Sequence, residues 1–179
     1  MTRKLVYYVA MTVDHYIAHE DETMDGFLME GQHVTDYLNS LRDFDTVLMG
    51  RRTYEWGYQF GIQPGEPSPV YGHMMQYVFS QSMNAYQHTQ LQVIREEPSD
   101  FVRQLKAQVG GSIYLCGGGQ LAGTLLESGL VDELLLKINP VVFGSGIPVF
   151  GRLTRGFKLT LLNTKVYTNG VMFTHYTIQ

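Results

Sequence analysis

The sequence is poor in cysteine, in charge and in tryptophan: among 179 residues there is one cysteine and one tryptophan, and charged residues make up 17%. Cys116 has no partner for an internal disulfide, which excludes a disulfide-stapled scaffold and suits a reducing compartment. The hydrophobic fraction of 44% excludes an intrinsically disordered chain. The 13 Lys and Arg do not outnumber the 17 Asp and Glu, so we expect no nucleic-acid partner.

Long apolar runs are also missing. No stretch approaches the roughly 20 consecutive apolar residues that a transmembrane helix needs. The first apolar run is short and leads into Asp14 and His15 without the small-residue cleavage site of a signal peptide. We therefore expect a cytoplasmic protein with no membrane partner. No internal repeat or linker divides the chain, so we predict one domain over residues 1–179.

Strand-like and helix-like segments alternate along the chain. Nearly continuous apolar runs predict buried strands, and apolar residues at helical spacing predict helices. The predicted strands are 5–11, 46–49, 77–79, 91–94, 112–116 and 134–138, and residues 14–25 are predicted as a loop. The predicted helices are 32–42 with Val34, Tyr37, Leu38 and Leu41 as its apolar stripe, 53–60, a helix capped by Ser99 with Val109 on its apolar face, and one ending at Gly129.

The C-terminal segment has a different pattern. Two long strand-like stretches, 158–167 and 171–178, flank Thr168-Asn169-Gly170, and Asn-Gly between strands is a strong hairpin signal. Alternating strands and helices imply a mainly parallel sheet covered by helices on both faces. We therefore predict an α/β three-layer sandwich whose central sheet is mostly parallel and ends in an antiparallel C-terminal hairpin.

The first motif with chemical content is Gly117-Gly118-Gly119-Gln120-Leu121-Ala122, which follows a predicted strand and opens a helix. Such a turn leaves the first helical N–H groups open to an anion. The letters also satisfy the Rossmann dinucleotide fingerprint, but Asn139-Pro140 stands where an acidic ribose ligand is expected. Anion binding is the favoured interpretation, and tight strand–helix packing is the alternative.

A second strand–glycine–helix junction is Gly50-Arg51-Arg52-Thr53. Two arginines at a helix N-terminus oppose the helix dipole, and a bound phosphate would explain them. The alternative is an exposed basic turn paired with Asp43, Asp45 or Glu55. A dinucleotide needs several phosphate contacts, so two such junctions together favour a nucleotide.

These motifs occur in an order that resembles a known family. The chain is similar to the dihydrofolate reductase superfamily, and more closely to its branch related to the reductase domain of the bifunctional riboflavin-biosynthesis deaminase-reductase. The resemblance covers nearly the whole chain. It is carried by residues 10–18, by 45–55 with Gly50-Arg51-Arg52-Thr53, by Leu115-Cys116-Gly117-Gly118-Gly119, and by 140–150 with Phe143-Gly144-Ser145-Gly146.

The resemblance implies NADPH as the hydride donor, a small-molecule substrate, a homodimer and a dihydrofolate reductase-like fold. The substrate side would include Val34, Tyr37 and Leu38 on the helix 32–42. The implied cofactor contacts are Ala10 and Ile17 at the nicotinamide, Gly50, Arg51, Arg52 and Thr53 at the adenine-side phosphates, Ser80 and Gln81 at the adenosine, and Gly117, Gly118, Gly119, Gln120 and Leu121 at the pyrophosphate.

Two departures from the family bear on the substrate. Val34 occupies the helix position of the substrate-binding carboxylate of dihydrofolate reductases, and Asp36 lies about 200° round the helix from it. The riboflavin-type Ser-x-Asp-Gly-Lys reads Thr12-Val13-Asp14-His15-Tyr16, without Gly-Lys, and no deaminase motif is present. The catalytic residues are therefore unknown from the sequence, with water or Tyr37 as a candidate proton relay.

Other candidate residues give weaker evidence for a chemical role. His15 and His19 lie in a predicted loop, so we interpret them as solvated polar residues and expect no metal site. Cys116 is interpreted as a small packing residue. The leading hypothesis is an NADPH-dependent reductase that resembles the 5-amino-6-(5-phosphoribosylamino)uracil reductase domain and reduces a C=N or C=O bond of a small heterocyclic or sugar-linked substrate. The alternatives are a dihydrofolate reductase with a relocated acid and a non-enzymatic dinucleotide-binding module.

Overall fold

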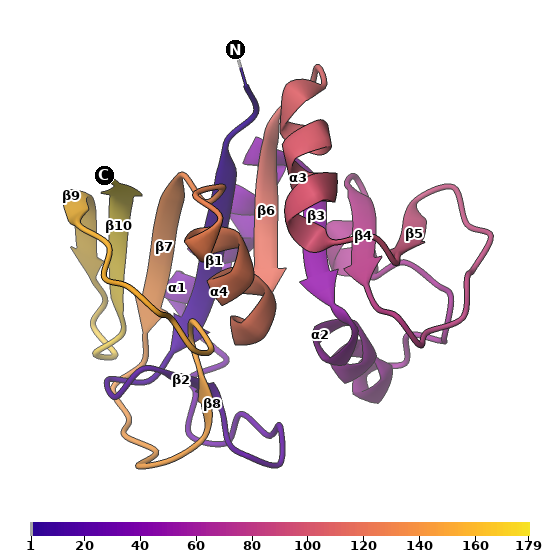
Figure 1. The fold of residues 1–179 in the computed structure, drawn as a ribbon. Coiled ribbons are helices and arrows are strands. Elements are labelled where there is room, and N and C mark those ends of the chain that lie inside the picture. Colours follow the sequence, from indigo (N-terminus) through magenta and orange to yellow (C-terminus); the bar gives the residue numbers. More distant parts are fainter. Residues whose placement is uncertain (1) are drawn as a thin grey trace.

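The centre of the molecule is an eight-stranded sheet, seen in a computed structural model that describes residues 2–179 (Figure 1). In spatial order its strands are β5 (Leu91–Ile94), β4 (Met75–Phe79), β3 (Phe44–Gly50), β6 (Ser112–Gly117), β1 (Leu5–Met11), β7 (Glu133–Ile138), β10 (Met172–Ile178) and β9 (Leu159–Val166). All neighbouring strands from β5 to β7 pair in parallel, whereas β10 is antiparallel to both β7 and β9. This arrangement confirms the predicted fold class.

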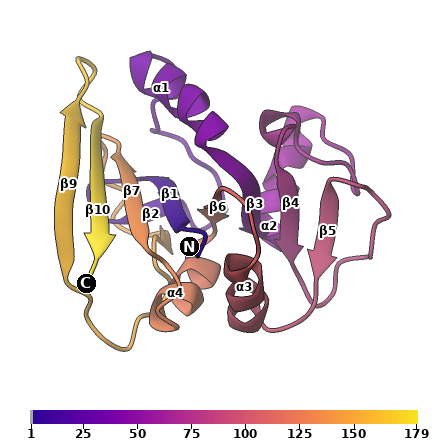
Figure 2. The ribbon, with the colours of Figure 1, turned by 90° about the horizontal axis from the view of Figure 1, so that it is seen from above.

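Helices cover both faces of this sheet, as Figure 2 shows. Helices α3 (Pro98–Ala107) and α4 (Gly119–Glu127) pack on one face, and α1 (Gln32–Ser40) lies on the other. Successive side chains of β1 alternate between the two cores: Tyr7 points to the α3–α4 side and Tyr8 to the α1 side. Both faces of the central strands are therefore buried, which explains why their sequences read as unbroken apolar runs.

Several short elements connect these layers. They are β2 (Tyr16–Ala18), η1 (Leu41–Asp43), α2 (Arg51–Glu55), η2 (Trp56–Phe60), η3 (Pro69–Tyr71) and β8 (Ile147–Pro148). Strands β2 and β8 form a separate antiparallel pair, so the prediction of a loop through 14–25 is wrong at β2. Two strands this short show no periodicity of their own. No helix within residues 2–179 has the length and apolar character needed to cross a membrane.

Two predicted helices have different limits in the structure. The helix predicted over 53–60 begins at Arg51 and continues as a 3₁₀ helix from Trp56. Helix α3 begins at Pro98 rather than being capped by Ser99, because proline is well suited to the first helical position. It ends at Ala107, so Val109 lies beyond it and is fully exposed instead of buried.

Helix α1 differs from expectation in what it buries. Of the predicted apolar stripe only Leu41 is fully buried, in the 3₁₀ turn after the helix, and Leu38 is 51% exposed. The buried residue of the helix itself is His33, whose Nε2 lies 2.9 Å from the Leu28 carbonyl oxygen. Its Nδ1 lies 3.1 Å from Asn169 Nδ2, in the turn of the C-terminal hairpin. The hairpin turn therefore helps to hold the N-terminal end of α1.

Candidate active site

The two strand–glycine–helix junctions lie next to each other in the sheet. Strand β3 ends at Gly50 and runs into α2, and the adjacent β6 ends at Gly117 just before α4. A Cβ placed on Gly50 would meet nothing closer than the Gly118 backbone nitrogen, at 3.8 Å. Two helix N-termini thus converge at the carboxyl edge of a parallel sheet, which is where open α/β sheets bind ligands.

Two more of the predicted residues lie against this junction. A Cβ on Gly118 would be 3.5 Å from Thr53 Oγ1 and 3.8 Å from Ile17 Cδ1. Thr53 belongs to α2 and Ile17 to β2, so three segments far apart in the chain meet at one glycine. The structure therefore brings together Gly50, Thr53, Gly118 and Ile17. Ala10 lies near the carboxyl end of β1, the strand next to β6.

The N-terminus of α4 supplies unpaired backbone donors. The first intrahelical bond runs from the Ala122 N–H to the Gly118 carbonyl, and no side chain of residues 2–179 caps the helix. The N–H groups of Gly119, Gln120 and Leu121 precede that bond and lie at the positive end of the helix dipole. The side chain of Leu121 is buried in the core, so this residue can offer a ligand only its backbone.

Gly119 also has a packing role. Tight packing was the alternative to anion binding for this glycine motif. A Cβ on Gly119 would come within 2.0 Å of the Pro148 carbonyl oxygen. One helical turn further on, a Cβ on Gly123 would come within 2.2 Å of the Phe150 carbonyl oxygen. The glycine face of α4 is thus pressed against residues 148–150, and this contact sets the position of the helix N-terminus.

Both arginines of the β3–α2 junction are paired within the chain. Arg51 Nε lies 2.6 Å from Glu55 Oε1, and its Nη1 donates to Ser82 Oγ at 2.8 Å. Arg52 Nε lies 3.4 Å from Glu22 Oε1, and its side chain is 81% exposed. The Glu55 pairing is the one expected of a basic turn without a ligand. Asp45, another expected partner, is bonded instead to the buried Arg3.

Ser80 and Gln81 follow β4, the strand on the other side of β3. Ser80 Oγ accepts hydrogen bonds from the backbone N–H groups of Ser82 and Met83, which forms a tight turn. Gln81 is exposed, and its Nε2 donates to the Arg95 carbonyl oxygen at 2.6 Å. This turn after β4 also contains Ser82, whose hydroxyl accepts a hydrogen bond from Arg51. Ser80 and Gln81 are therefore close in the chain to the partner of Arg51.

On the α1 side, the three residues predicted for the substrate point in two directions. Val34 and Leu38 are one helical turn apart on one face and are half-buried and exposed, respectively. Tyr37 turns to the sheet instead, where its hydroxyl lies 3.1 Å from the Tyr114 hydroxyl and 3.4 Å from the Tyr71 hydroxyl. Burial raises the pKa of Tyr37 to about 12. Tyr37 is therefore a poor proton relay.

Cys116 belongs to the same buried cluster. The Tyr71 hydroxyl lies 3.5 Å from Cys116 Sγ, and burial raises the pKa of the Cys116 thiol. The thiol is therefore kept in its neutral form, as befits a packing residue rather than a nucleophile.

One residue of this region was missed by the sequence reasoning. Lys137 lies near the end of β7, directly opposite Ala10 of β1, and its Nζ is 5.6 Å from the centre of the Tyr37 ring. Among residues 2–179, no carboxylate lies within 4.0 Å of its ammonium group. Burial lowers the pKa of Lys137. The signal available in the sequence was a single charge within the apolar run 134–138.

Asp36 does not replace the carboxylate missing at Val34. Its Oδ2 lies 2.6 Å from Lys165 Nζ and accepts from the Tyr167 hydroxyl at 2.8 Å, both at the C-terminal hairpin. The carboxylate of α1 is thus bound to the hairpin, as its angular distance from position 34 suggested.

The segment after β1, which carries Asp14 and His19, makes structural contacts with residues 143–144. The His19 ring stacks on Phe143 with a centroid distance of 3.6 Å, and Asp14 accepts hydrogen bonds from the backbone N–H groups of Phe143 and Gly144. These contacts fasten the loop around 143–144 to the segment after β1. Within residues 2–179, no three His, Cys, Asp or Glu side chains form a group that could hold a metal ion.

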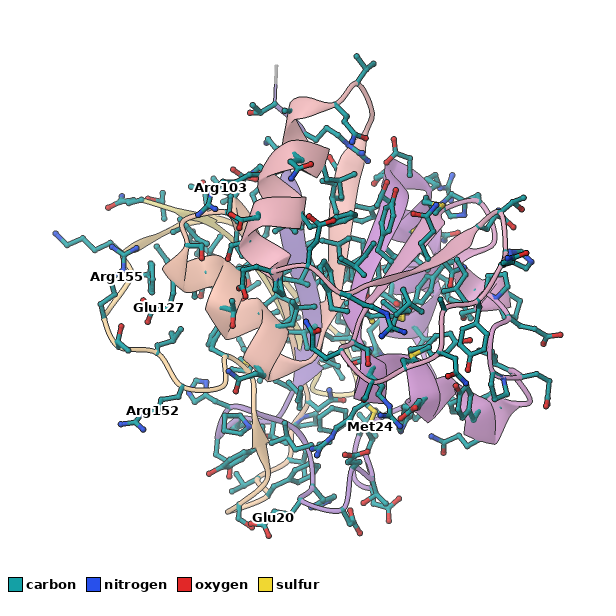
Figure 3. The ribbon with its side chains drawn as sticks, turned by 45° about the vertical axis from the view of Figure 1, so that its right-hand side comes forward. Glu20, Met24, Arg103, Glu127, Arg152 and Arg155 are labelled. Atoms are coloured by element: carbon teal, nitrogen blue, oxygen red, sulfur yellow. The ribbon has the colours of Figure 1, made fainter. Side chains whose placement is uncertain are left out.

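A surface hollow of about 790 Å³ lies at the opposite edge of the sheet, toward the start of β7 and the end of α4. Figure 3 labels Arg155, which lines the hollow, and Glu127, with which it forms an ion pair of 3.7 Å. Lys4, which also lines the hollow, is paired with Glu133 at 2.6 Å. Lys4 and Arg155 in this hollow are thus each paired with a carboxylate. The converging N-termini of α2 and α4 lie at the other end of the strands. We therefore place the candidate site at the carboxyl edge.

The fold is that of the dihydrofolate reductase-like superfamily, as the resemblance indicated. Within that class, the chain belongs to the RibD C-terminal domain family, whose model matches residues 3–173.

Individual proteins agree with this assignment. The chain is 35% identical over 177 residues to the uncharacterized protein YwjB of Bacillus subtilis (strain 168), and the match covers 98% of each protein. A putative riboflavin biosynthesis protein from Shewanella sp. PV-4 has the same fold, with a TM-score of 0.82, 20% identity and coverage of 100% of this chain and 99% of that one. The fold also matches a diaminohydroxyphosphoribosylaminopyrimidine deaminase/5-amino-6-(5-phosphoribosylamino)uracil reductase from Thermotoga maritima, with a TM-score of 0.73, 15% identity and coverage of 99% of this chain and 57% of that one.

Proposed function

We propose that the protein is an NADPH-dependent reductase that acts on a C=N or C=O bond of a small heterocyclic or sugar-linked molecule. The observation that carries this proposal is the contact between Gly50 and the Gly117–Gly118 turn, where the starts of α2 and α4 converge. The family supports it, because the Thermotoga maritima protein of the same fold is a deaminase/5-amino-6-(5-phosphoribosylamino)uracil reductase. Oxidoreductase chemistry on a nucleotide cofactor is thus the conclusion favoured by site and family together.

The residues at the junction suit a dinucleotide. The free N–H groups at the start of α4 would hold the pyrophosphate, with Thr53 and Ile17 within contact distance of the Gly118 Cβ position beside it. Arg51 and Arg52 would hold the adenine-side phosphates, with Ser80 and Gln81 along the adenosine. Ala10 would lie at the nicotinamide. When bound, NADPH supplies a hydride, and the protein's part is to align the acceptor carbon with it.

A dihydrofolate substrate is disfavoured by this chain. Folate reduction uses a carboxylate at the helix position that Val34 occupies, and Asp36 is bound to Lys165. Without an acid there, a pterin ring loses its anchoring pair and its proton donor. We propose a riboflavin-type acceptor instead.

The experiment follows NADPH oxidation with two acceptors, dihydrofolate and the phosphoribosylamino-pyrimidine of riboflavin synthesis. Turnover of the pyrimidine with negligible turnover of dihydrofolate is the expected result. Rapid dihydrofolate turnover would contradict the assignment, since it requires an acid at α1 that the structure binds elsewhere. Tight NADPH binding without turnover of either acceptor would favour the alternative of a dinucleotide-binding module. Failure to bind NADPH would refute the proposal that NADPH is the cofactor.

We also propose that the protein works in the cytoplasm as a homodimer, with no nucleic-acid or membrane partner. All eight residues of the edge strand β9 are exposed, including Leu161, Leu162 and Val166. Apolar side chains on an open edge strand favour pairing with another strand.

A further inference from the structure

We propose that Lys137 is the proton donor of this reductase and delivers its proton to the acceptor nitrogen or oxygen. The proposal rests on the proposed reductase function. It assigns a role to a residue of β7 that neither the glycine junctions nor the family motifs include.

The position of Lys137 supports this role. It is aligned with Ala10 across the β1–β7 ladder, and residues aligned in a parallel ladder project from the same face of the sheet. That face is the α1 side, because Tyr8 and Phe173, on the strands flanking β7, belong to the core under α1. Lys137 therefore lies beside the strand end proposed for the nicotinamide, under the helix proposed for the substrate.

The surroundings of the ammonium group favour proton donation. The ring of Tyr37 from α1 lies 5.6 Å from Nζ, and Tyr8 of β1 packs edge-to-face against both Tyr37 and Phe173. Both tyrosines have pKa values raised to about 12 by burial, so both stay neutral. Burial without a carboxylate partner disfavours the charged form of Lys137 more than the Tyr37 ring favours it, so this ammonium group is a stronger acid than an exposed lysine.

The other candidate acids in the region are engaged or unsuited. The Tyr37 hydroxyl faces Tyr114 and Tyr71, inside the core. The Cys116 thiol is buried beside Tyr71, and the Asp36 carboxylate is bound to Lys165 and Tyr167. Lys137 differs from these groups, because no carboxylate of residues 2–179 pairs with its ammonium group.

The chemistry balances with this assignment. As the acceptor carbon receives a hydride, the electron pair of its C=N or C=O bond moves to the nitrogen or oxygen. One Nζ–H bond of Lys137 breaks and an N–H or O–H bond forms on the acceptor, leaving a neutral amine. The amine then regains a proton from water, so the lysine is restored for the next turnover.

The first test measures Lys137 directly. The chain has five lysines, so protein labelled with ¹³C- and ¹⁵N-lysine gives a small set of side-chain signals, and the K137M variant identifies one of them. We expect the Lys137 signal to titrate below the ordinary lysine pKa of 10.5, and to shift when NADP⁺ is added. A Lys137 signal that titrates at 10.5 or above, or that does not change on adding NADP⁺ while the nucleotide binds, would overturn the proposal.

The second test uses activity with the pyrimidine acceptor. K137M should lower the rate of hydride transfer by about 10²–10⁴-fold, the usual contribution of a general acid. NADPH affinity should not change, which also shows that the variant is folded. K137R keeps the positive charge but cannot release a proton, so it should remain slow, whereas the matched control K158M should match the wild type.

The outcomes separate the two proposals. Wild-type rates in K137M, or rates restored in K137R, would exclude proton donation by Lys137 while leaving the reductase intact. Failure of the wild-type chain to bind NADPH would refute the reductase and this role with it. If NADPH binds but neither acceptor reacts, the labelled-lysine titration decides the state of Lys137 by itself.

Discussion

The Asp36 carboxylate and the Lys165 ammonium group form an ion pair of 2.6 Å between helix α1 and strand β9, 129 positions apart in the chain. Tyr167 adds a hydrogen bond to the same carboxylate oxygen, and Asn169 reaches His33 at the start of α1. The helix that carries Val34 and Leu38 is therefore positioned by the C-terminal hairpin, so the substrate side depends on the far end of the sequence.

This contact predicts an acid-sensitive attachment of α1. Hydrogen bonds from Lys165, Gln32 and Tyr167 lower the pKa of Asp36 from 3.8 to about 2. A carboxyl group with a depressed pKa in the folded state stabilises the protein above its unfolded pKa, and this contribution is lost as the pH falls. Asp36→Asn should therefore lower the melting temperature at neutral pH, and the difference from wild type should shrink as the pH falls from about 4 to about 2.

A matched control for that prediction is Asp100→Asn. Asp100 is exposed and bonds Arg103 on its own helix, so its replacement should have little effect at any pH. A destabilisation by Asp36→Asn that stays constant down to pH 2 would show that the carboxylate charge is not what holds the hairpin to α1.

The glycine face of α4 gives a second prediction. Gly119→Ala would place a Cβ within 2.0 Å of the Pro148 carbonyl oxygen, so backbone must move. Overpacking of this kind typically costs about 1–3 kcal/mol, and the same displacement would misplace the N–H groups of the helix N-terminus. We expect a lower melting temperature and weaker NADPH binding. In Gly156→Ala the added Cβ meets nothing within 4 Å, so that variant should change neither.

The β3–α2 junction gives a third prediction, about nucleotide choice. A 2′-phosphate can accept hydrogen bonds from a guanidinium group, so NADPH should bind more tightly than NADH. Arg51→Ala should cost about 1.5–3 kcal/mol of NADPH binding, roughly 10- to 150-fold in affinity, and leave NADH binding nearly unchanged. Fluorescence titration of both nucleotides measures this. Arg103→Ala, which removes a comparable intrahelical ion pair on α3, is the control.

The result of that titration decides between two interpretations of Arg51. An equal loss of affinity for NADPH and NADH would mean that Arg51 supports the junction through Glu55 and Ser82 without contacting the 2′-phosphate. If the affinity for neither nucleotide falls, Arg51 only forms a surface ion pair, which was the alternative considered from the sequence.

The sequence predicted most of the sheet because its central strands are buried on both faces and read as apolar runs. It could not predict β2 and β8, which pair with each other across the chain and are two or three residues long. Likewise, the burial of His33 depends on Asn169, a contact set by the hairpin rather than by the helix's own periodicity.

The candidate site was predicted in part for a similar reason. Gly50 and Gly118 each follow a recognisable strand, but their contact depends on β3 lying next to β6 in the sheet order. The position of Lys137 opposite Ala10 follows only from the register of β7 with β1, which the sequence does not reveal. Local patterns identify the parts of such a site, and strand order and register determine which parts meet.

The last prediction concerns the open edge of the sheet. Strand β9 has no neighbour on its outer side within residues 2–179, and it exposes Leu161 and Leu162 by 53% and 51%. Pairing of two β9 strands would satisfy the free backbone groups and cover these side chains. Light scattering at micromolar concentration should therefore give twice the 20.3 kDa chain mass, and Leu161→Lys should shift the protein toward the monomer without lowering its helix and strand content. The control Val109→Lys changes an equally apolar and fully exposed residue after α3 and should leave the dimer intact. A wild-type mass of 20.3 kDa would refute the dimer, and a dimer that survives Leu161→Lys would place its interface away from β9.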